Sequence, residues 1–521
     1  MDVTLDNVNI NTSETGGAAV SVTGKGDTNI ELDGNNTLTS GYYHAGLEHN
    51  KTDDSGTLTI TDNNNDGKLT ANGGYKGAGI GGGYSSNGTV TITGGDINAN
   101  GGYKGAGIGG GNSGNGAVTI TGGDINANGG YKGAGIGGGN EKDGQVTITG
   151  GEIIANGGDG SAGIGGGYFG NGTVNISGGT ITEASGGGEG AGIGGGDSGN
   201  GTVNISGGTI TKASGGYYGA GIGGGSSGLG NVSIEGNVTI KNAQGGVGAA
   251  GIGGGARGTS DAAGNGNKIS IKSTAAGSPN ITAKGGKASD DGLSGGAAIG
   301  SGSVVAGATE VKSDITIEGK VTINATGGGN VAIGDNIDGE KVFNGLAGGT
   351  NIKRTDSNGK DVTQDGDVVA EPEPEPKPEP EEPEKPAQPT VTPTGAETAE
   401  APSTGSVEVE HPVTVEGLYV TNVLGKQITH TCTQNGTTLT IRANGIVTSA
   451  HLTLGMVRTL KAQGVKTLVF TTLLSRSTTV SVDALLAADP DAPDETAVVW
   501  THTGPRTALT IGGADHSALL K

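Results

Sequence analysis

Three kinds of side chain able to bind a ligand recur at a constant phase in this sequence. They are carboxylates, lysines and tyrosines: Asp96, Asp124 and Glu152; Lys76, Lys104 and Lys132; Tyr75, Tyr103 and Tyr131. Further tyrosines occur in the corresponding segments downstream, at Tyr217 and Tyr218, and upstream, at Tyr42 and Tyr43. If the repeats stack, each set becomes a stripe of hydrogen-bonding groups suited to an extended polymer such as a polysaccharide. The alternative is that the stripes are ordinary surface ladders that compensate one another.

The carboxylates pose an electrostatic problem. Stacked strands would place them about 4.8 Å apart, and like charges at that spacing repel each other. The sequence offers two remedies: a shared cation such as Ca²⁺, which prefers oxygen ligands, or the lysine column lying alongside. The calcium repeat G-G-x-G-x-D is absent, because no Asp follows AGIGGG in the required register. Calcium is therefore the one cofactor that stays open at this stage.

Catalysis by a Ser–His or Cys–His nucleophile is excluded over most of the chain. No histidine lies between His49 and His411, and Cys432 is the only cysteine. An enzyme would need carboxylates, Lys, Arg or Tyr, and the least regular stretch, residues 257–296, holds several of these groups. They are Arg257, Asp261, Lys284, Lys287, Asp290 and Asp291. A polysaccharide lyase or hydrolase using residues 257–291 is the enzymatic alternative to a non-catalytic protein.

The elements that must position these residues are set by an internal repeat. The hexapeptide AGIGGG occurs seven times with spacings of 28 to 30 residues, centred on Ile80, Ile108, Ile136, Ile164, Ile193, Ile222 and Ile252. Degenerate copies upstream and downstream extend the series to about eleven units within residues 1–345. A fixed period of this size is typical of a solenoid. Each copy also satisfies G-x-G-x-x-G, but a dinucleotide site needs one such motif opening a helix, so this reading is rejected.

Within each unit the apolar residues alternate with polar ones. Residues 89–93 (TVTIT) and 96–100 (DINAN) place Val or Ile and Ala on one face, and Gly pairs separate the two runs. A period of two predicts strands, and the recurring Asn-Gly and Asp-Gly pairs suit tight corners. Such short strands bury enough surface only when each pairs with its equivalent one coil later. We therefore predict an all-β, right-handed parallel β-helix of about eleven coils.

The amino-acid composition agrees with this fold class and argues against several other classes of protein. The 521 residues include 114 Gly, 31% hydrophobic and 3% aromatic residues, which is too little apolar material for one large globular core. A net charge of −22 disfavours a nucleic-acid partner, which needs a basic surface. One cysteine excludes a disulfide framework, and no apolar run approaches the length of a membrane span.

The chain changes character after the solenoid. Residues 346–405 are expected to form an irregular segment and a Pro/Glu-rich linker, which favours an extended spacer. Residues 406–521 have ordinary composition and predict a small α+β domain of unknown role. Strands are expected at 437–442, 465–471, 496–501 and 507–511, and helices at 452–463 and 483–488, with Asp483 as a candidate N-cap.

A family resemblance can be given on particular segments. VTLDNVNI, ELDGNNTLTSGYYHAGLEH and GKLTANGGYKGAGIGGG resemble the carbohydrate-binding β-helix family of secreted and surface proteins of Firmicutes. The resemblance is best over residues 1–110 and continues more loosely to about residue 260. It implies a right-handed β-helix, binding of cellulose or acidic plant polymers, and bound calcium. Its motifs are mainly structural, so no ligand-binding residue of the family is carried over.

These observations lead to one expected function and two alternatives. The expected protein is a non-catalytic, extracellular or cell-surface β-helix that binds a polysaccharide or a host or bacterial glycan, as an adhesin or binding module, and is a monomeric rod. The alternatives are the lyase or hydrolase and a structural stalk that presents the C-terminal domain. Met1 is followed directly by a strand-like segment without the features of a signal peptide, so we expect the natural chain to begin further upstream.

Overall fold

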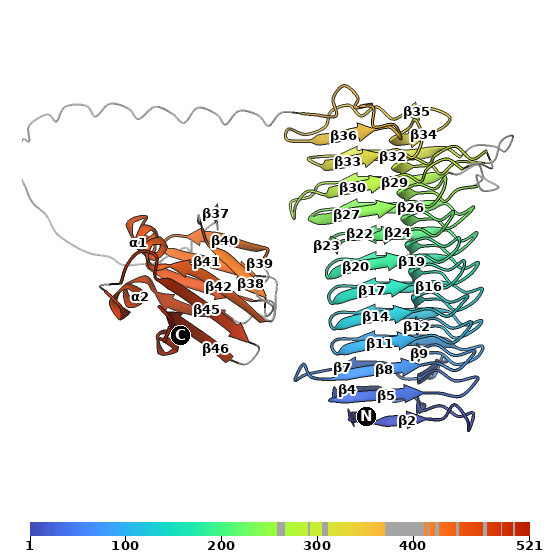
Figure 1. Ribbon diagram of the computed structural model, residues 1–521, viewed down its shortest axis with the longest axis horizontal. Helices are drawn as coiled ribbons and strands as arrows, with labels where there is room; N and C mark the ends of the chain where they lie inside the picture. Colours follow the sequence, from blue (N-terminus) through green and yellow to red (C-terminus); the bar gives the residue numbers. More distant parts are fainter. Residues whose placement is uncertain are drawn as a thin grey trace, which may run out of the picture. The chain divides into compact units, whose positions relative to one another are not determined.

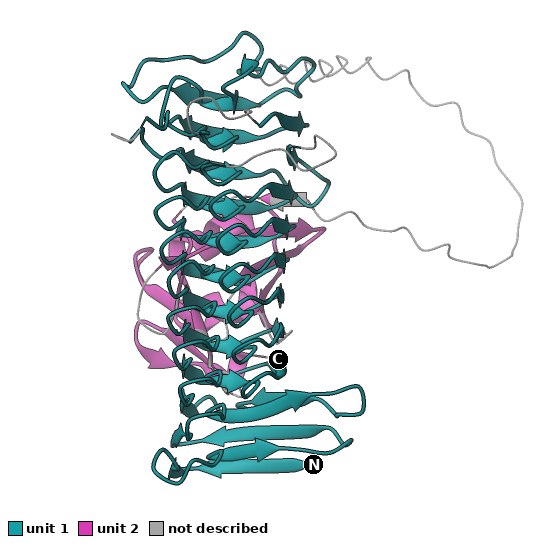
Figure 2. Cartoon of the chain, turned by 90° about the vertical axis from the view of Figure 1, so that its right-hand side faces the viewer, with its two compact units in different colours: residues 1–381 teal, residues 382–521 magenta. Residues whose placement is uncertain are grey.

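The computed structural model describes most of the chain in two compact units, residues 1–381 and 382–521 (Figure 2). In the first unit it describes residues 1–257, 266–289, 292–304 and 311–369. In the second it describes residues 411–413, 415, 417–422, 427–443, 447–472, 477–490, 492–503 and 506–520. Each unit is described below by itself.

The first unit is a stack of coils, each built from three strands that lie on three faces (Figure 1). Face A contains β1 Asp2–Asp6, β4 Thr28–Asp33, β7 Leu58–Thr61, β10 Asn87–Ile92, β13 Gly116–Ile120, β16 Gly144–Ile148, β19 Gly172–Ile176, β22 Gly201–Ile205, β26 Gly230–Glu235, β29 Asn267–Lys272 and β32 Ser313–Glu318. Face B contains β2 Asn9–Asn11, β5 Asn35–Thr39, β8 Lys68–Asn72, β11 Asp96–Asn100, β14 Asp124–Asn128, β17 Glu152–Asn156, β20 Thr180–Ser185, β23 Gly208–Ile210, β24 Ala213–Ser214, β27 Val238–Gln244, β30 Asn280–Lys284, β33 Thr322–Thr326 and β36 Asn351–Thr355.

From β9 onward, face C is made of the shortest strands, which carry the Ile-Gly pair. It contains β3 Val20–Val22, β6 Leu47–Lys51, β9 Ile80–Gly81, β12 Ile108–Gly109, β15 Ile136–Gly137, β18 Ile164–Gly165, β21 Ile193–Gly194, β25 Ile222–Gly223, β28 Ile252–Gly253, β31 Ile299–Gly300 and β34 Ile333–Asp335. The longer β6 is the exception, because it also pairs antiparallel with the start of β10 and so joins faces A and C.

Identical residues of successive coils lie directly over one another. Ile108 pairs in parallel with Ile80 and Ile136, and Ile97 pairs with Ile125. The inward Ile, Val, Leu and Ala side chains form one continuous buried core along the stack. The prediction of a parallel β-helix is confirmed. Parallel strands one coil apart satisfy backbone groups that a single coil leaves unpaired, which is why the repeat must stack.

The solenoid is longer than expected at its C-terminal end. Face B has twelve successive levels, and the last strand, β36, pairs in parallel with β33. The boundary predicted at residue 345 is therefore wrong, and the segment expected to be irregular contributes the strand at the twelfth level of face B. The sequence hides this strand because it lacks the AGIGGG hexapeptide and because Arg354 occupies the inward phase held by Ala325 one level below.

Arg354 is part of a cap that closes the stack. Its guanidinium is fully buried and pairs with Glu340, 2.8 Å away, and with the buried Asp367, 2.7 Å away. The Glu340 carboxylate also accepts hydrogen bonds from the backbone N–H groups of Ala332 and Ile333. In the coil below, the equivalent N–H of Ile299 donates to Ala332 O at 3.1 Å. Glu340 therefore supplies the acceptor that a following coil would have supplied.

The second unit is a small α+β domain with its own core. One sheet has the order β37-β40-β41-β43-β44 and the other β39-β38-β42-β45-β46-β47. Their bounds are β37 His411–Val413, β38 Tyr419–Asn422, β39 Gln427–Ile428, β40 His430–Asn435, β41 Thr438–Ala443, β42 Val447–Thr453, β43 Thr467–Thr471, β44 Ser477–Ser481, β45 Ala497–Thr503, β46 Arg506–Ile511 and β47 Ala514–Asp515. The helices are α1 Leu454–Ala462 and α2 Val482–Ala488, with a 3₁₀ turn at Ser517–Leu519.

All four strands and both helices predicted here are present, but the N-cap assignment is wrong. Ser481 caps α2 through its side chain, and Asp483 lies in the first turn. The buried core of this domain includes Phe470 and Trp500. No helix among the described residues of either unit is long and apolar enough to cross a membrane.

Candidate functional site

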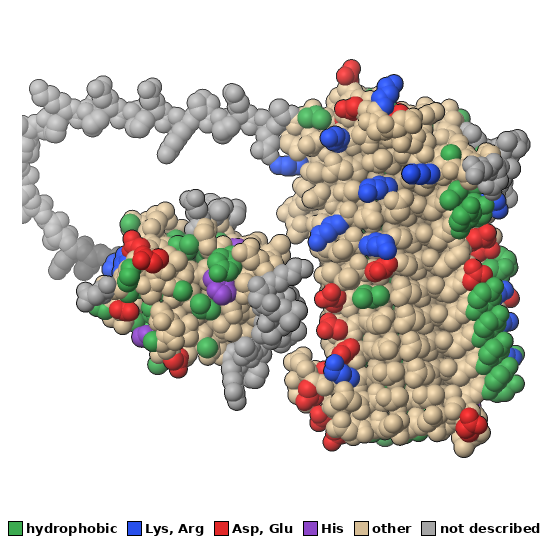
Figure 3. Space-filling model, viewed as in Figure 1, with side chains coloured by type: hydrophobic (Ala, Val, Ile, Leu, Met, Phe, Trp, Pro, Cys, Tyr) green, Lys and Arg blue, Asp and Glu red, His purple; other side chains and the backbone are tan. Residues whose placement is uncertain are grey.

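Four tyrosines form a continuous stack along one edge of the solenoid. Ring centroids are 4.8 Å apart for Tyr42 and Tyr75, 5.0 Å for Tyr75 and Tyr103, and 5.0 Å for Tyr103 and Tyr131, with interplanar angles of 17°, 5° and 16°. We call these four residues the tyrosine stack. They lie in the loops that lead from face B to face C. Figure 3 shows hydrophobic side chains gathered in a line along this edge.

Backbone hydrogen bonds hold these loops at coil spacing. Gly105 N donates to Gly102 O within one turn, and Gly102 N donates to Gly77 O of the coil below, both at 2.9 Å. Gly130 N repeats the contact with Gly105 O at 3.0 Å. Because identical turns are bonded to one another, side chains at the same phase are forced into register. The stacking of Tyr75, Tyr103 and Tyr131 expected from their spacing is confirmed.

The stack presents ring edges and hydroxyl groups rather than ring faces. Each inner ring lies nearly parallel to a neighbour about 5 Å away on both sides, so its two faces are covered. Tyr103 nevertheless remains 42% exposed, which leaves its edge and its phenolic oxygen in contact with solvent. A ligand along this edge would meet a row of hydroxyl groups, each a donor and an acceptor, and would not stack on the inner rings.

Two of the three lysines in the lysine column lie over aromatic rings. Lys76 Nζ is 4.4 Å from the ring centroid of Tyr84, and Lys132 Nζ is 3.8 Å from that of Tyr168. Tyr84 and Tyr168 belong to the loops that follow face C. Within the described parts of the chain, no carboxylate forms an ion pair with Lys76, Lys104 or Lys132.

The acidic column forms on another corner, so the lysines do not neutralise it. Asp96, Asp124 and Glu152 pair in register at the start of β11, β14 and β17. The five-residue β11 separates Asp96 from the loop that carries Lys104, a distance of about 16 Å along the strand. The expected compensation by the lysine column is therefore wrong. Instead Lys68 Nζ pairs with Asp96 at 2.8 Å, and Thr182 Oγ1 donates to Glu152 at 2.9 Å.

Calcium does not fit this column. Both ends of the column already have protein partners, and no group of three or more His, Cys, Asp or Glu side chains among the described residues is arranged to hold a metal ion. The calcium that the family resemblance implies therefore has no supporting donor set here.

Asp124, in the middle of the acidic column, should destabilise the solenoid at neutral pH. The side chain of Asp124 is exposed, but partial desolvation by its neighbours, then the charges of Glu152 and Asp96, raise its pKa above the ordinary value of 3.8. An acid with a raised folded-state pKa favours folding below that ordinary value, and this contribution is lost as the pH rises through the raised pKa. Asp124→Asn should therefore stabilise the protein by a few tenths of a kcal/mol at pH 7 and by less at pH 3.5. Urea unfolding at both pH values, with exposed Asn126→Ala as control, tests this; equal or lower stability of Asp124→Asn at pH 7 contradicts it.

The tyrosine stack ends at Tyr131. Asp159 occupies the next position of the tyrosine stack, and its hydrogen bond with the Tyr131 hydroxyl raises the pKa of that phenol. One coil further, burial and then the neighbouring Asp197 raise the pKa of Glu189. The stack thus ends after four rings, because Asp159 and then Gly188 occupy the next positions of its column, while Glu189 lies in the phase of Lys132. Tyr217, 55% exposed, is separated from the stack by these coils.

Tyr218 is not a surface residue, so its assignment as a ligand-binding residue is wrong. It is only 6% exposed and packs against Ala249, Ala256 and Leu293. Arg257 Nη2 donates to its hydroxyl at 2.7 Å, and the guanidinium lies 3.9 Å from the ring centroid. The partner that buries Tyr218 comes from the following coil and from the irregular stretch, which sequence spacing does not reveal.

The proposed catalytic insertion is only partly described. Asp261, Asp290 and Asp291 lie outside the described residues. Arg257 is engaged with Tyr218, and its charge also acts on Glu189. Lys284 ends β30 on face B with its side chain exposed, and Lys287 accepts a hydrogen bond at its backbone oxygen from Gly248 N at 2.9 Å. Arg257 therefore contacts Tyr218 of the preceding coil.

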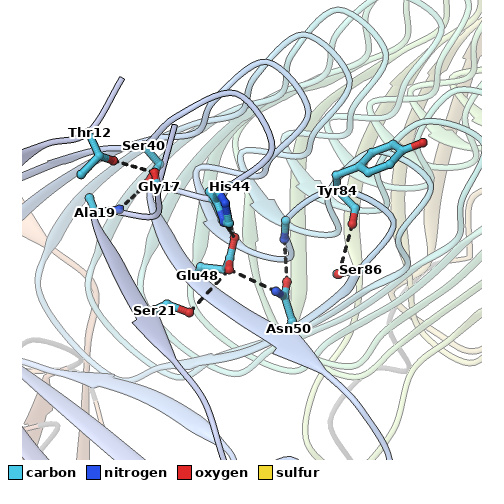
Figure 4. Close-up of polar contacts among 12 residues, drawn as sticks. Thr12, Gly17, Ala19, Ser21, Ser40, His44, Glu48, Asn50, Tyr84 and Ser86 are labelled. Atoms are coloured by element: carbon cyan, nitrogen blue, oxygen red, sulfur yellow. Dashed lines mark hydrogen bonds and ion pairs between the residues drawn. The ribbon is translucent and has the colours of Figure 1, made fainter. Parts of the chain in front are cut away.

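A buried polar network near the N-terminal end of the tyrosine stack was not predicted from the sequence (Figure 4). Glu48 is 4% exposed, and its carboxylate accepts hydrogen bonds from Ala45 N at 3.1 Å and Asn50 Nδ2 at 3.1 Å. His44 Nδ1 lies 2.8 Å from the same carboxylate. A carboxylate that orients an imidazole in this way also holds the turn that carries Tyr42 and Tyr43. The signal was the His-x-x-x-Glu spacing at residues 44–48.

A family model supports the fold described above. The model for the Beta helix repeat matches residues 64–84, 90–112, 118–140, 146–168, 174–197 and 203–226. The matched segments therefore carry β-helix repeats, and they lie within the parallel β-helix that the structure shows. No curated protein and no solved structure gives a significant match. The bacterial origin and the carbohydrate ligand suggested by the resemblance are expectations that the repeat match does not address.

Proposed function

We propose that this protein is a non-catalytic extracellular or cell-surface module that binds a polysaccharide along the tyrosine stack and the adjacent lysines. The observation that carries the proposal is the exposed row of phenolic edges at about 5 Å intervals, beside ammonium groups that have no carboxylate partner among the described residues. The Beta helix repeat match supports a surface or carbohydrate-related role in general terms.

A polymer suits this surface better than a small ligand does. The four rings extend over three coil spacings and present phenolic groups at the same phase of each coil. Repeated weak contacts with one chain add through effective concentration, so that affinity grows with ligand length. The lysine column adds long-range attraction for anionic chains, which salt would screen.

Retention of the full chain on polysaccharides tests the proposal. We expect the wild type to be slowed in affinity gels containing at least one neutral or acidic plant, mucin or microbial polysaccharide. Tyr103→Ala removes the central hydroxyl and should weaken binding about three- to tenfold, the equivalent of one hydrogen bond. A triple variant with Gln in place of Lys76, Lys104 and Lys132 should weaken the binding of acidic polymers more than that of neutral ones. The loss of binding should be larger at low salt than at high salt.

Asn126→Ala, an exposed change on face B, is the matched control and should bind as the wild type does. Failure of the wild type on every polysaccharide, or equal binding by Tyr103→Ala and the wild type, contradicts the proposal. If retention persists in all solenoid variants and is lost only when residues 406–521 are changed, the stalk alternative is favoured.

The lyase or hydrolase alternative is favoured by one observation. Arg257, Tyr218 and Glu189 bring a cation, a phenol and a carboxyl of raised pKa close together, which is a combination suited to proton transfer beside an acidic sugar. This reading predicts release of unsaturated or reducing-end products from acidic polysaccharides, abolished by Arg257→Ala. Absence of product from every acidic polymer contradicts it.

A further inference from the structure

A discrete hollow of about 280 Å³ lies on face A, away from the tyrosine stack, and no residue of the stack lines it. Its floor is formed by Gly88, Gly116 and Ala117. Lys51 lies on one side and Gln145 on the other, two coils apart. Unlike the periodic columns, this hollow depends on residues that occur once in the solenoid.

Two departures from the repeat create the hollow. Ala117 has the smallest side chain in its column, where the in-register residues of the other regular coils are Thr89, Gln145, Thr173, Thr202 and Asn231. The second departure is β6, the only strand that pairs antiparallel with face A among the described residues, which brings Lys51 opposite Asn87. A missing side chain and an added wall therefore coincide at this level.

The polar groups around the hollow offer both donors and acceptors. Asn87 Oδ1 and Asn115 Oδ1 accept hydrogen bonds from the backbone N–H of Asn115 and Asp143, at 2.8 and 3.1 Å. These bonds fix both carboxamides and leave their NH₂ groups without an acceptor in the described part of the chain. Asp143 Oδ1 accepts from Asn171 N at 2.8 Å, so its second oxygen is available as an acceptor.

The remaining walls keep the hollow close to neutral. Lys51 Nζ donates to Ser55 O at 3.2 Å, which anchors the ammonium group beside the site. Asp143 contributes the one negative charge among the lining residues, so an anionic ligand would be repelled at one end and a cationic ligand at the other. Thr89 and Gln145 add groups that both donate and accept.

We infer that this hollow binds one ring of a neutral, hydroxyl-rich saccharide. Sugar hydroxyls donate and accept, which matches the amide, carboxylate and hydroxyl groups of the rim, while the C–H face of a ring would cover the glycine and Ala117 floor. The volume suits one ring rather than a folded chain. The inference deepens the proposed function by naming a sugar class, but it concerns a separate surface.

The chain itself supplies variants that should leave the fold intact. Ala117→Thr restores the residue found at Thr89, Thr173 and Thr202, and so fills the hollow with a side chain that the coil already accommodates. Asp143→Asn restores the corner residue of Asn87, Asn115 and Asn171 and removes only the charge. Thr202→Ala is the matched control, because it exchanges the same two residue types, in the reverse direction, at the equivalent position of a coil that lies away from Lys51.

Calorimetric titration of the full chain with cellotetraose, mannotetraose, xylotetraose and tetragalacturonate tests the inference. We expect at least one neutral tetrasaccharide to bind in preference to tetragalacturonate. Ala117→Thr should weaken that binding at least tenfold and Asp143→Asn about threefold, because a charge-assisted hydrogen bond is replaced by a neutral one. Thr202→Ala and Tyr103→Ala should bind the tetrasaccharide as the wild type does.

The outcomes separate this inference from the proposed function. Equal binding by Ala117→Thr and the wild type, preference for tetragalacturonate, or no tetrasaccharide binding at all overturns the hollow as a sugar site. In each case, polysaccharide retention that depends on Tyr103 would leave the proposed function standing. The converse result is a loss of tetrasaccharide binding in Ala117→Thr together with polysaccharide retention that is unchanged in Tyr103→Ala. That result supports the hollow as a sugar site and contradicts the tyrosine stack as the polysaccharide site.

Discussion

Arg354→Ala should unfold the last coils of the solenoid while leaving the central coils intact. The substitution removes the cation that pairs with Glu340 at 2.8 Å and Asp367 at 2.7 Å, and leaves both carboxylates without it. Removing one partner of a buried ion pair costs about 3–5 kcal/mol, because the remaining charge stays in a poorly solvated site. We therefore expect the C-terminal cap to open at neutral pH.

The effect should be local because each coil of a solenoid contacts only its neighbours. Hydrogen exchange measured by peptide-level mass spectrometry should show loss of protection in β33 (Thr322–Thr326) and β36 (Asn351–Thr355). Protection in β14 to β17 should not change. The peptide that contains Ile333 is a sensitive reporter, since the hydrogen bond from Ile333 N to Glu340 at 3.1 Å depends on the position of that carboxylate.

Lys353→Ala is the matched control, because the neighbouring Lys353 side chain points to solvent from the same strand. It removes one positive charge without touching the cap and should leave exchange unchanged. Ending the chain at residue 345 should reproduce the Arg354→Ala pattern. If Arg354→Ala and Lys353→Ala exchange alike, the buried ion pairs do not hold the end of the solenoid.

Gly137→Ala should destabilise the centre of the solenoid by about 3–5 kcal/mol, combining a backbone conformation that L residues avoid with overpacking. Gly137 has φ of 135°, and a Cβ there would lie 2.0 Å from the carbonyl oxygen of Gly165 in the next coil. That oxygen cannot move away without breaking the stacking of face C. The coils at β15 and β18 should therefore separate.

Thermal unfolding of the full chain, followed by far-UV circular dichroism, should show a lower midpoint or an additional early transition. Gly26→Ala is the control, because a Cβ at that position meets nothing within 4 Å. A Gly137→Ala protein as stable as Gly26→Ala would mean that the Ile-Gly strands of successive coils are not in close contact. Since the same geometry recurs at Gly109 and Gly165, either position serves as an independent repetition.

Some site residues were predictable because they follow the period of the repeat. Tyr75, Tyr103 and Tyr131 stack because identical turns precede them, and Asp96, Asp124 and Glu152 line up because their strands are in register. Tyr218 and the lysines were different. Their neighbours come from other loops and other faces, so their spacing along the chain said nothing of what they contact.

The repeated residues by themselves determined the parallel β-helix, the inward Ile and Ala columns and the register of the tyrosine stack. This was possible because a constant repeat length brings equal residues to equal positions whenever the coils stack. Only the tertiary structure decided how the solenoid ends, where its charges meet and where its surface is hollow. Arg354 interrupts the inward Ala column. Lys51, which lines one side of the hollow, belongs to β6, a strand that pairs antiparallel with face A. Burying a guanidinium or forming a pocket depends on partners distant in sequence, and no local pattern of residues specifies those partners.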